Sequence, residues 1–94
     1  MNQATTSVAA GKAVTLRFFA AIRETIGQSE EPWRTHAATV GDLRDELLAR
    51  GGAYAQALAR GRAVRVALNQ VLCAESEPLP EGAEVAFFPP VTGG

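Results

Sequence analysis

The sequence predicts an α+β domain in which one main helix packs across one face of a small mixed sheet. Two patterns favour this class: one well-capped helix in the middle of the chain, and several short segments with the two-residue alternation of half-buried strands. In addition, 94 residues suffice for one modest core but not for two. A ferredoxin-like arrangement would need two full crossover helices, and the sequence predicts only one long helix.

The first elements are two strands. In Val14–Ala20 every second side chain, starting from Val14, is apolar, which is the period of a strand with one face in the core. Gly27 breaks the stretch that follows. A weaker strand is expected over Ser29–Thr35, where Pro32 predicts either a place at the edge of the sheet or a shortened strand, because proline donates no hydrogen bond.

The main helix follows in TVGDLRDELLARGG. Thr39 is a good N-cap, Asp42 stands three residues later as in a capping box, and the pair Gly51 and Gly52 ends the helix. Its apolar face comprises Val40, Leu43, Leu47 and Leu48. The segment AYAQALAR is expected to add a short second helical piece.

Three strand segments complete the domain: AVRVALN, VLCA and EVAFF. A tight turn at Asn69–Gln70 should join the first two, and PLPEG should form a loop and a type I turn before the last. Because side chains alternate along a strand, Val85 and Phe87 should face the core and Phe88 should face outward. An outward aromatic at this position indicates a partner surface.

The chain divides into three expected parts: a mobile leader over residues 1–13, the domain over 14–88, and an extended tail over 89–94. Neither a secretion signal nor an apolar run near the ~20 residues of a membrane helix is present, so we expect a cytoplasmic protein without a membrane partner.

From Val66 onward there is no Lys or Arg, whereas four Glu occur. If this half of the chain gathers around the tail, the tail end is acidic, which disfavours a nucleic-acid partner. The acidic residues are Glu75, Glu77, Glu81 and Glu84.

The domain shows few residues with the chemistry of a catalytic or metal site. The single histidine, His36, follows a strand in a loop and is expected to be solvated. Cys73 lies in a short apolar strand with no cationic neighbour in sequence, which favours an inert, packed thiol. One Cys and one His cannot supply a tetrahedral metal site, so no metal and no bound cofactor are expected.

The tail has a different chemistry. Pro89 and Pro90 end sheet pairing and favour an extended path. Gly93 and Gly94 carry no side chains, so the chain can thread a narrow channel and present the α-carboxylate of Gly94. A carboxylate is a poor electrophile, but once activated as an acyl adenylate it can be attacked by a sulfur species or an amine. The tail is therefore a candidate reactive group.

The ending VAFFPPVTGG resembles the C-terminal signature of the molybdopterin synthase small-subunit family (the MoaD family), which are β-grasp sulfur carriers. LRFFAAIRETIG resembles the family's first strand and the segment after it, ATVGDLRDELLAR its helix, and VALNQ its strand and turn before the last hairpin. The resemblance covers roughly residues 14–94. Arg23 also matches a family position, without an assigned role.

The resemblance implies a function. An E1-like activating enzyme uses ATP to adenylate Gly94, a persulfide-derived sulfur replaces AMP to give a thiocarboxylate, and the tail donates this sulfur to a cyclic pyranopterin precursor in the large synthase subunit. Gly94 is then the reacting residue, and the catalytic side chains belong to the large subunit, with which the chain is expected to form a heterotetramer. The residues expected to bind partners are Phe88, Pro89, Pro90, Val91, Thr92 and Gly93. An acidic tail end would suggest basic entrances on these partners.

Three other functions remain open at this point. Sulfur carriers for thiamine thiazole or cysteine synthesis also end in two glycines. A ubiquitin-like modifier would be joined to lysines through Gly94. A β-grasp interaction module would keep its activity without Gly94.

Overall fold

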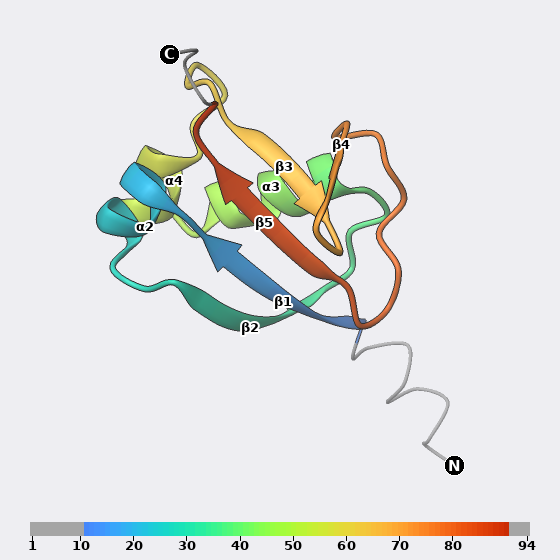
Figure 1. Cartoon of the computed structure of the whole chain (residues 1–94). Coiled ribbons are helices and arrows are strands. Elements are labelled where there is room, and N and C mark those ends of the chain that lie inside the picture. The colour runs from blue at the N-terminus through green and yellow to red at the C-terminus, as the bar shows by residue number, and fades with distance from the viewer. Residues whose placement is uncertain (1–10, 91–94) are drawn as a thin grey trace.

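Residues 11–90 are described by the structure, a computed structural model, and comprise five strands and three helices (Figure 1). In chain order the elements are β1 (Lys12–Phe18), α2 (Ala20–Ile26), β2 (Glu30–Thr35), α3 (Val40–Ala49), α4 (Gly52–Ala57), β3 (Arg65–Leu68), β4 (Val71–Cys73) and β5 (Glu84–Phe88). Most of the expected leader and the end of the expected tail, residues 1–10 and 91–94, lie outside the described residues.

The strands form one mixed sheet in the order β2-β1-β5-β3-β4. The central pair, β1 and β5, is parallel, with Leu16 opposite Val85, and every other pairing is antiparallel. β2 is a six-residue edge strand, which confirms the first of the two alternatives predicted from Pro32. The sheet therefore brings the start and the end of the domain side by side at its centre.

The helices cover one face of the sheet, and the core lies between the helices and the sheet (Figure 1). The alternation expected in β1 and β5 is confirmed, because Leu16, Val85 and Phe87 are fully buried while Phe88 is only half-buried. Phe87 stacks on Phe18, with 6.1 Å between the ring centroids. One main helix held by a mixed sheet is a β-grasp fold, as the α+β prediction and the family resemblance implied.

The cap and the turn predicted from the sequence are also confirmed. The Thr39 hydroxyl accepts a hydrogen bond from the backbone N–H of Asp42 at 3.1 Å, so α3 begins at the expected cap. Asn69 and Gln70 both adopt positive φ, 50° and 71°, which matches the two-residue turn of a tight hairpin between β3 and β4.

The structure differs from the prediction at the start of β1 and by an additional helix, α2. β1 begins at Lys12, inside the segment assigned to the leader, because Lys12 and Ala13 pair with Thr35 and Arg34 of β2. The Lys12 ammonium also donates to the carbonyl oxygens of Ala37 at 2.9 Å and Leu79 at 2.7 Å. The helix α2 was not predicted at all. It is only seven residues long, so its apolar pattern is limited to Ile22 and Ile26, one turn apart, which is too short a pattern to predict a helix. Gly27, expected only as a break, is its C-cap with φ 92°.

Candidate functional site

The base of the expected tail lies at the end of β5, the central strand. Phe88 is the last residue of this strand, and its side chain lies on the open face of the sheet, opposite the face covered by helices. Pro89 and Pro90 follow directly, and both are half-buried. Three of the predicted partner-binding residues thus lie at the end of a central strand. Val91, Thr92, Gly93 and the predicted reacting residue Gly94 lie outside the described residues.

A groove of about 540 Å³ opens beside these residues on the open face. Its lining is apolar apart from Gln70 and Glu84. The other lining residues are Phe19, Ala20, Ala67, Ala86, Phe88, Pro89 and Pro90. Small side chains form its floor, since Ala67 and Ala86 face each other in the register of β3 and β5. An apolar hollow bounded by two aromatic rings is the kind of surface that receives a hydrophobic anchor from another protein.

The second aromatic, Phe19, was not singled out by the sequence. Its side chain is 38% exposed because the chain turns sharply out of β1 at this point, where Ala20 adopts φ 51°. This left-handed conformation is unfavourable for a residue with a Cβ. The FF pair at 18–19 could have indicated it, because Phe18 and Phe19 must point to opposite faces.

A smaller pocket, of about 200 Å³, lies on the other side of the tail base. It is formed by α2, the end of α4 and the segment before β3, and Pro89 and Arg62 both line it. In Figure 1 this segment before β3 runs close to the end of β5. The tail base therefore has a hollow on each of its two sides.

The condition for an acidic tail end is not met at the described base of the tail. Glu84 begins β5, so it lies at the opposite end of this strand from Pro89. Glu81 is placed farther away still, because its carboxylate accepts a hydrogen bond from the backbone N–H of Ala13 at 3.2 Å, near the start of the parallel strand β1. Glu75 is bound to arginines of other segments. Glu75, Glu81 and Glu84 therefore do not gather at the tail base, although Glu84 lines the far end of the groove.

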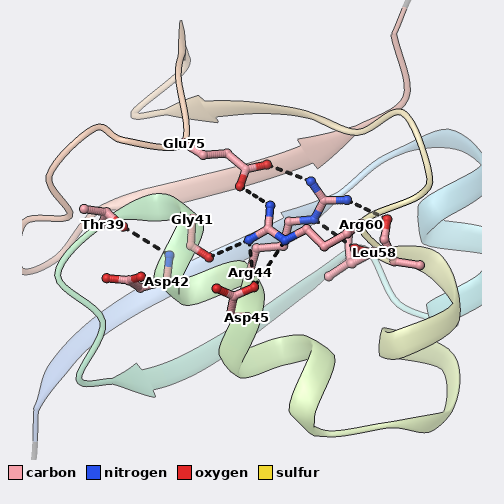
Figure 2. Close-up of polar contacts among 9 residues, drawn as sticks. Thr39, Gly41, Asp42, Arg44, Asp45, Leu58, Arg60 and Glu75 are labelled. Atoms are coloured by element: carbon pink, nitrogen blue, oxygen red, sulfur yellow. Dashed lines mark hydrogen bonds and ion pairs between the residues drawn. The ribbon is translucent and has the colours of Figure 1, made fainter.

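The segment before β3 is held in place by α3. Arg44 of this helix, 4% exposed, donates to the carbonyl oxygens of Leu58 at 2.8 Å and Ala59 at 2.7 Å, and to the Glu75 carboxylate at 2.7 Å (Figure 2). Arg60 binds the same carboxylate from the solvent side. These bonds give the wall of the smaller pocket a fixed position relative to the core.

Glu75 has a shifted pKa as a result of this network. Partial burial alone would raise the pKa of its carboxyl. The hydrogen bonds and charges of Arg60 and Arg44 outweigh that effect, and the pKa lies below its ordinary value of 4.5.

Cys73 and His36 lie where they were expected. Cys73 is half-buried against the core, and burial, with a smaller contribution from the Glu77 charge, raises the pKa of its thiol above the ordinary 9.0. His36 is exposed, as is Arg23 on α2. Within residues 11–90, no cluster of three His, Cys, Asp or Glu side chains could hold a metal ion, and no helix is long and apolar enough to cross a membrane.

Comparisons with known proteins agree on one family. Residues 16–94 match the ThiS family. The chain is 43% identical over 77 residues to the molybdopterin synthase sulfur carrier subunit of Escherichia coli, covering 82% of this chain and 94% of that protein. It is 36% identical over 88 residues to small archaeal modifier protein 3 of Haloferax volcanii, covering 84% of this chain and 96% of that protein.

A solved structure of a complex is similar as well. It contains subunits 1 and 2 of the molybdopterin-converting factor of Helicobacter pylori, and the matched chain has a TM-score of 0.61 and 26% identity, covering 87% of this chain and 99% of that one. Because the family match includes most of the chain and runs through the glycine pair, the chain belongs to the ThiS family, as a relative of the molybdopterin synthase sulfur carrier subunits.

Proposed function

We propose that this chain is the sulfur carrier of a molybdopterin synthase, with the α-carboxylate of Gly94 as the group that carries the sulfur. The observation that carries the proposal is the family match, which extends through Gly94, combined with 43% identity to a sulfur carrier subunit. The position of Pro89 and Pro90 at the end of a central strand supports it, because a well-packed β5 can aim the residues that follow.

The proposed reaction activates the Gly94 carboxylate, loads it with sulfur and then delivers that sulfur. An E1-like activating enzyme joins the Gly94 carboxylate to AMP from ATP, with release of pyrophosphate. A persulfide sulfur attacks the acyl carbon and AMP leaves. A thiol then cleaves the resulting S–S bond, which leaves a thiocarboxylate on Gly94. This group delivers its sulfur to a cyclic pyranopterin precursor, and two loaded copies are needed for one dithiolene. ATP is consumed by the activating enzyme and is no cofactor of this chain.

The groove on the open face is the surface we propose for the large synthase subunit, in a cytoplasmic heterotetramer. Phe19 and Phe88 would flank a hydrophobic residue of the large subunit while the tail enters the active site of that subunit. The Helicobacter pylori complex supports a two-subunit assembly, since a similar chain there is bound to subunit 2. The acid and base groups of the reaction belong to the large subunit.

The test is the intact mass of the protein after incubation with ATP, the cognate activating enzyme and a sulfur source. We expect replacement of one oxygen by sulfur, localised to Gly94 by fragmentation. Loaded protein should then convert the precursor when the cognate large subunit is added. An unchanged mass with an activating enzyme proven active on another carrier contradicts the proposal.

Protein modification is the second candidate, favoured by the 36% identity to small archaeal modifier protein 3. In that function an amine rather than a sulfur attacks the activated Gly94. The same incubation distinguishes the two, because a modifier yields isopeptide adducts on lysines when cell extract is added, whereas a dedicated carrier yields only the thiocarboxylate.

A further inference from the structure

We propose that Arg62 and Arg65 form a basic rim at the base of the tail, and that this rim pairs with carboxylates on the large synthase subunit around the mouth of the channel that receives the tail. The inference rests on the proposed function, because it specifies the chemistry of a contact with the same partner. An acidic tail end would have required basic groups on the partner. A basic rim requires acidic groups there instead.

The two arginines flank the residues from which the tail departs. Arg65 begins β3 and is in register with Phe88. Its neighbour Val66 is buried in the core, so Arg65 lies on the open face, next to the groove. Arg62 lines the smaller pocket together with Pro89 on the other side. One cation therefore lies on each side of the segment formed by Phe88 and Pro89.

These side chains also differ from most other arginines of the domain in their pairing. Both are exposed, and within residues 11–90 neither has a hydrogen bond or ion pair through its side chain. By contrast, four arginines are ion-paired with carboxylates of the same chain: Arg17, Arg44, Arg50 and Arg60. The rim thus keeps its positive charge available, because Glu84, which lines the groove, begins β5 at the opposite end from Pro89 and is paired with Arg17, while Glu75 is paired with Arg44 and Arg60.

A docked partner cannot leave such charges uncompensated. If the large subunit covers the groove, Arg65 and Arg62 lie at the border of the contact and lose part of their hydration, which costs free energy unless anions face them. Guanidinium groups pair best with carboxylates, in a two-bonded geometry.

The length of the tail places this contact at the mouth of the channel rather than at the reacting group. The four residues after Pro90 span at most about 14 Å, and a tail that uses this reach carries Gly94 well away from the rim. The anion beside Arg62 and Arg65 is then a fixed group of the partner surface, whereas a phosphate of the Gly94 adenylate would be too far away.

The test compares charge reversals at matched positions. The variants Arg65→Glu and Arg62→Glu are measured against Arg34→Glu, which makes the same charge change at an exposed arginine of the edge strand β2. The dissociation constant and the association rate for the cognate large subunit are measured at about 50 mM and about 500 mM salt, because added salt screens exposed charges. The conservative variant Arg65→Lys keeps the charge, and thermal unfolding of each variant verifies the fold.

We expect Arg65→Glu and Arg62→Glu each to raise the dissociation constant on the order of tenfold at low salt, mainly through slower association, and to converge on the wild type at high salt. Arg65→Lys keeps the charge but not the two-bonded geometry, so it should lose less affinity than Arg65→Glu, and Arg34→Glu should stay within about twofold. Equal increases of the dissociation constant at all three reversed positions, or losses of affinity that do not depend on salt, would overturn the proposal of a basic rim. If the wild-type protein accepts sulfur but does not bind the large subunit, the synthase assignment fails instead, so the two failures are distinguishable.

Discussion

The guanidinium of Arg44 lies 2.7 Å from the carboxylate of Glu75, which joins α3 to the segment between β4 and β5. The same guanidinium donates to the carbonyl oxygens of Leu58 and Ala59, at the segment before β3. One nearly buried side chain therefore holds two segments that have no regular secondary structure of their own. A charge-assisted bond of this kind is stronger than a neutral one, and leaving any of its acceptors unpaired is costly.

Replacing Arg44 should destabilise the fold. We expect Arg44→Met to lower the free energy of unfolding by about 2–4 kcal/mol, because two carbonyl groups and a carboxylate lose their donor. Urea denaturation followed by circular dichroism measures this. The matched variant is Arg60→Met, whose side chain is 47% exposed and which should cost less than about 1 kcal/mol. Equal losses at the two positions would contradict the assignment of Arg44 as the anchoring residue.

Glu75 should make stability depend on pH in the acid range. Its pKa is lower in the folded state, so the folded carboxyl stays ionised while the unfolded one, with an ordinary value of 4.5, begins to bind a proton. This stabilising contribution is complete above pH 4.5 and is lost as the pH falls through the lower, folded value. Urea unfolding between about pH 3 and 7 should show a shallower decline for Glu75→Gln than for the wild type. An unchanged slope would show that other carboxyls dominate.

Phe87 and Phe88 should separate folding from binding. Phe87 is fully buried, and Phe87→Ala should cost about 3–5 kcal/mol of stability. Phe88 lines the open groove, so Phe88→Ala should leave the unfolding transition nearly unchanged and weaken binding to the large subunit by about tenfold or more. Calorimetric titration with the large subunit, next to thermal unfolding, measures both. A Phe88→Ala variant that binds like the wild type would exclude the groove as the docking surface.

Removing the reacting residue should abolish sulfur loading without affecting the fold. We expect deletion of Gly94, or extension by one residue, to give no thiocarboxylate in the mass assay, because the activated carboxylate is then absent or misplaced. The core lies within residues 14–87, so thermal unfolding should match the wild type. Retained loading in the deletion variant would refute the role of Gly94. Adding a side chain with Gly93→Val should slow loading, which kinetics with the activating enzyme would show.

Cys73 should be dispensable for sulfur transfer. Burial raises the pKa of its thiol, so the reactive thiolate is scarce at neutral pH. Cys73→Ser should load sulfur at the wild-type rate, and alkylation of wild-type Cys73 by iodoacetamide should accelerate only above about pH 9. Loss of loading in this variant would mean that the thiol relays sulfur to Gly94.

Local patterns predicted much of this fold. The cap at Thr39, the turn at Asn69 and the opposite directions of Phe87 and Phe88 each depend on a few neighbouring residues, and each is found in the structure. The helix α2 was missed because its seven residues contain a single apolar pair at helical spacing, Ile22 and Ile26, which is too short a signal. Its position depends on packing beside α4 and on the exit of the chain from β1.

The sequence by itself determined the class of fold, the outward position of Phe88 and the proline and glycine ending. These follow from periodicity, capping and backbone restriction, which act over a few residues. Only the tertiary structure decided the charge around the tail. The acidic residues from Glu75 to Glu84 are close to the tail in sequence, but β5 runs away from them. Arg62 and Arg65 precede the tail by more than twenty residues, yet the antiparallel pairing of β3 with β5 brings them to its base. Strand pairing, rather than distance along the chain, determines which charges meet a partner.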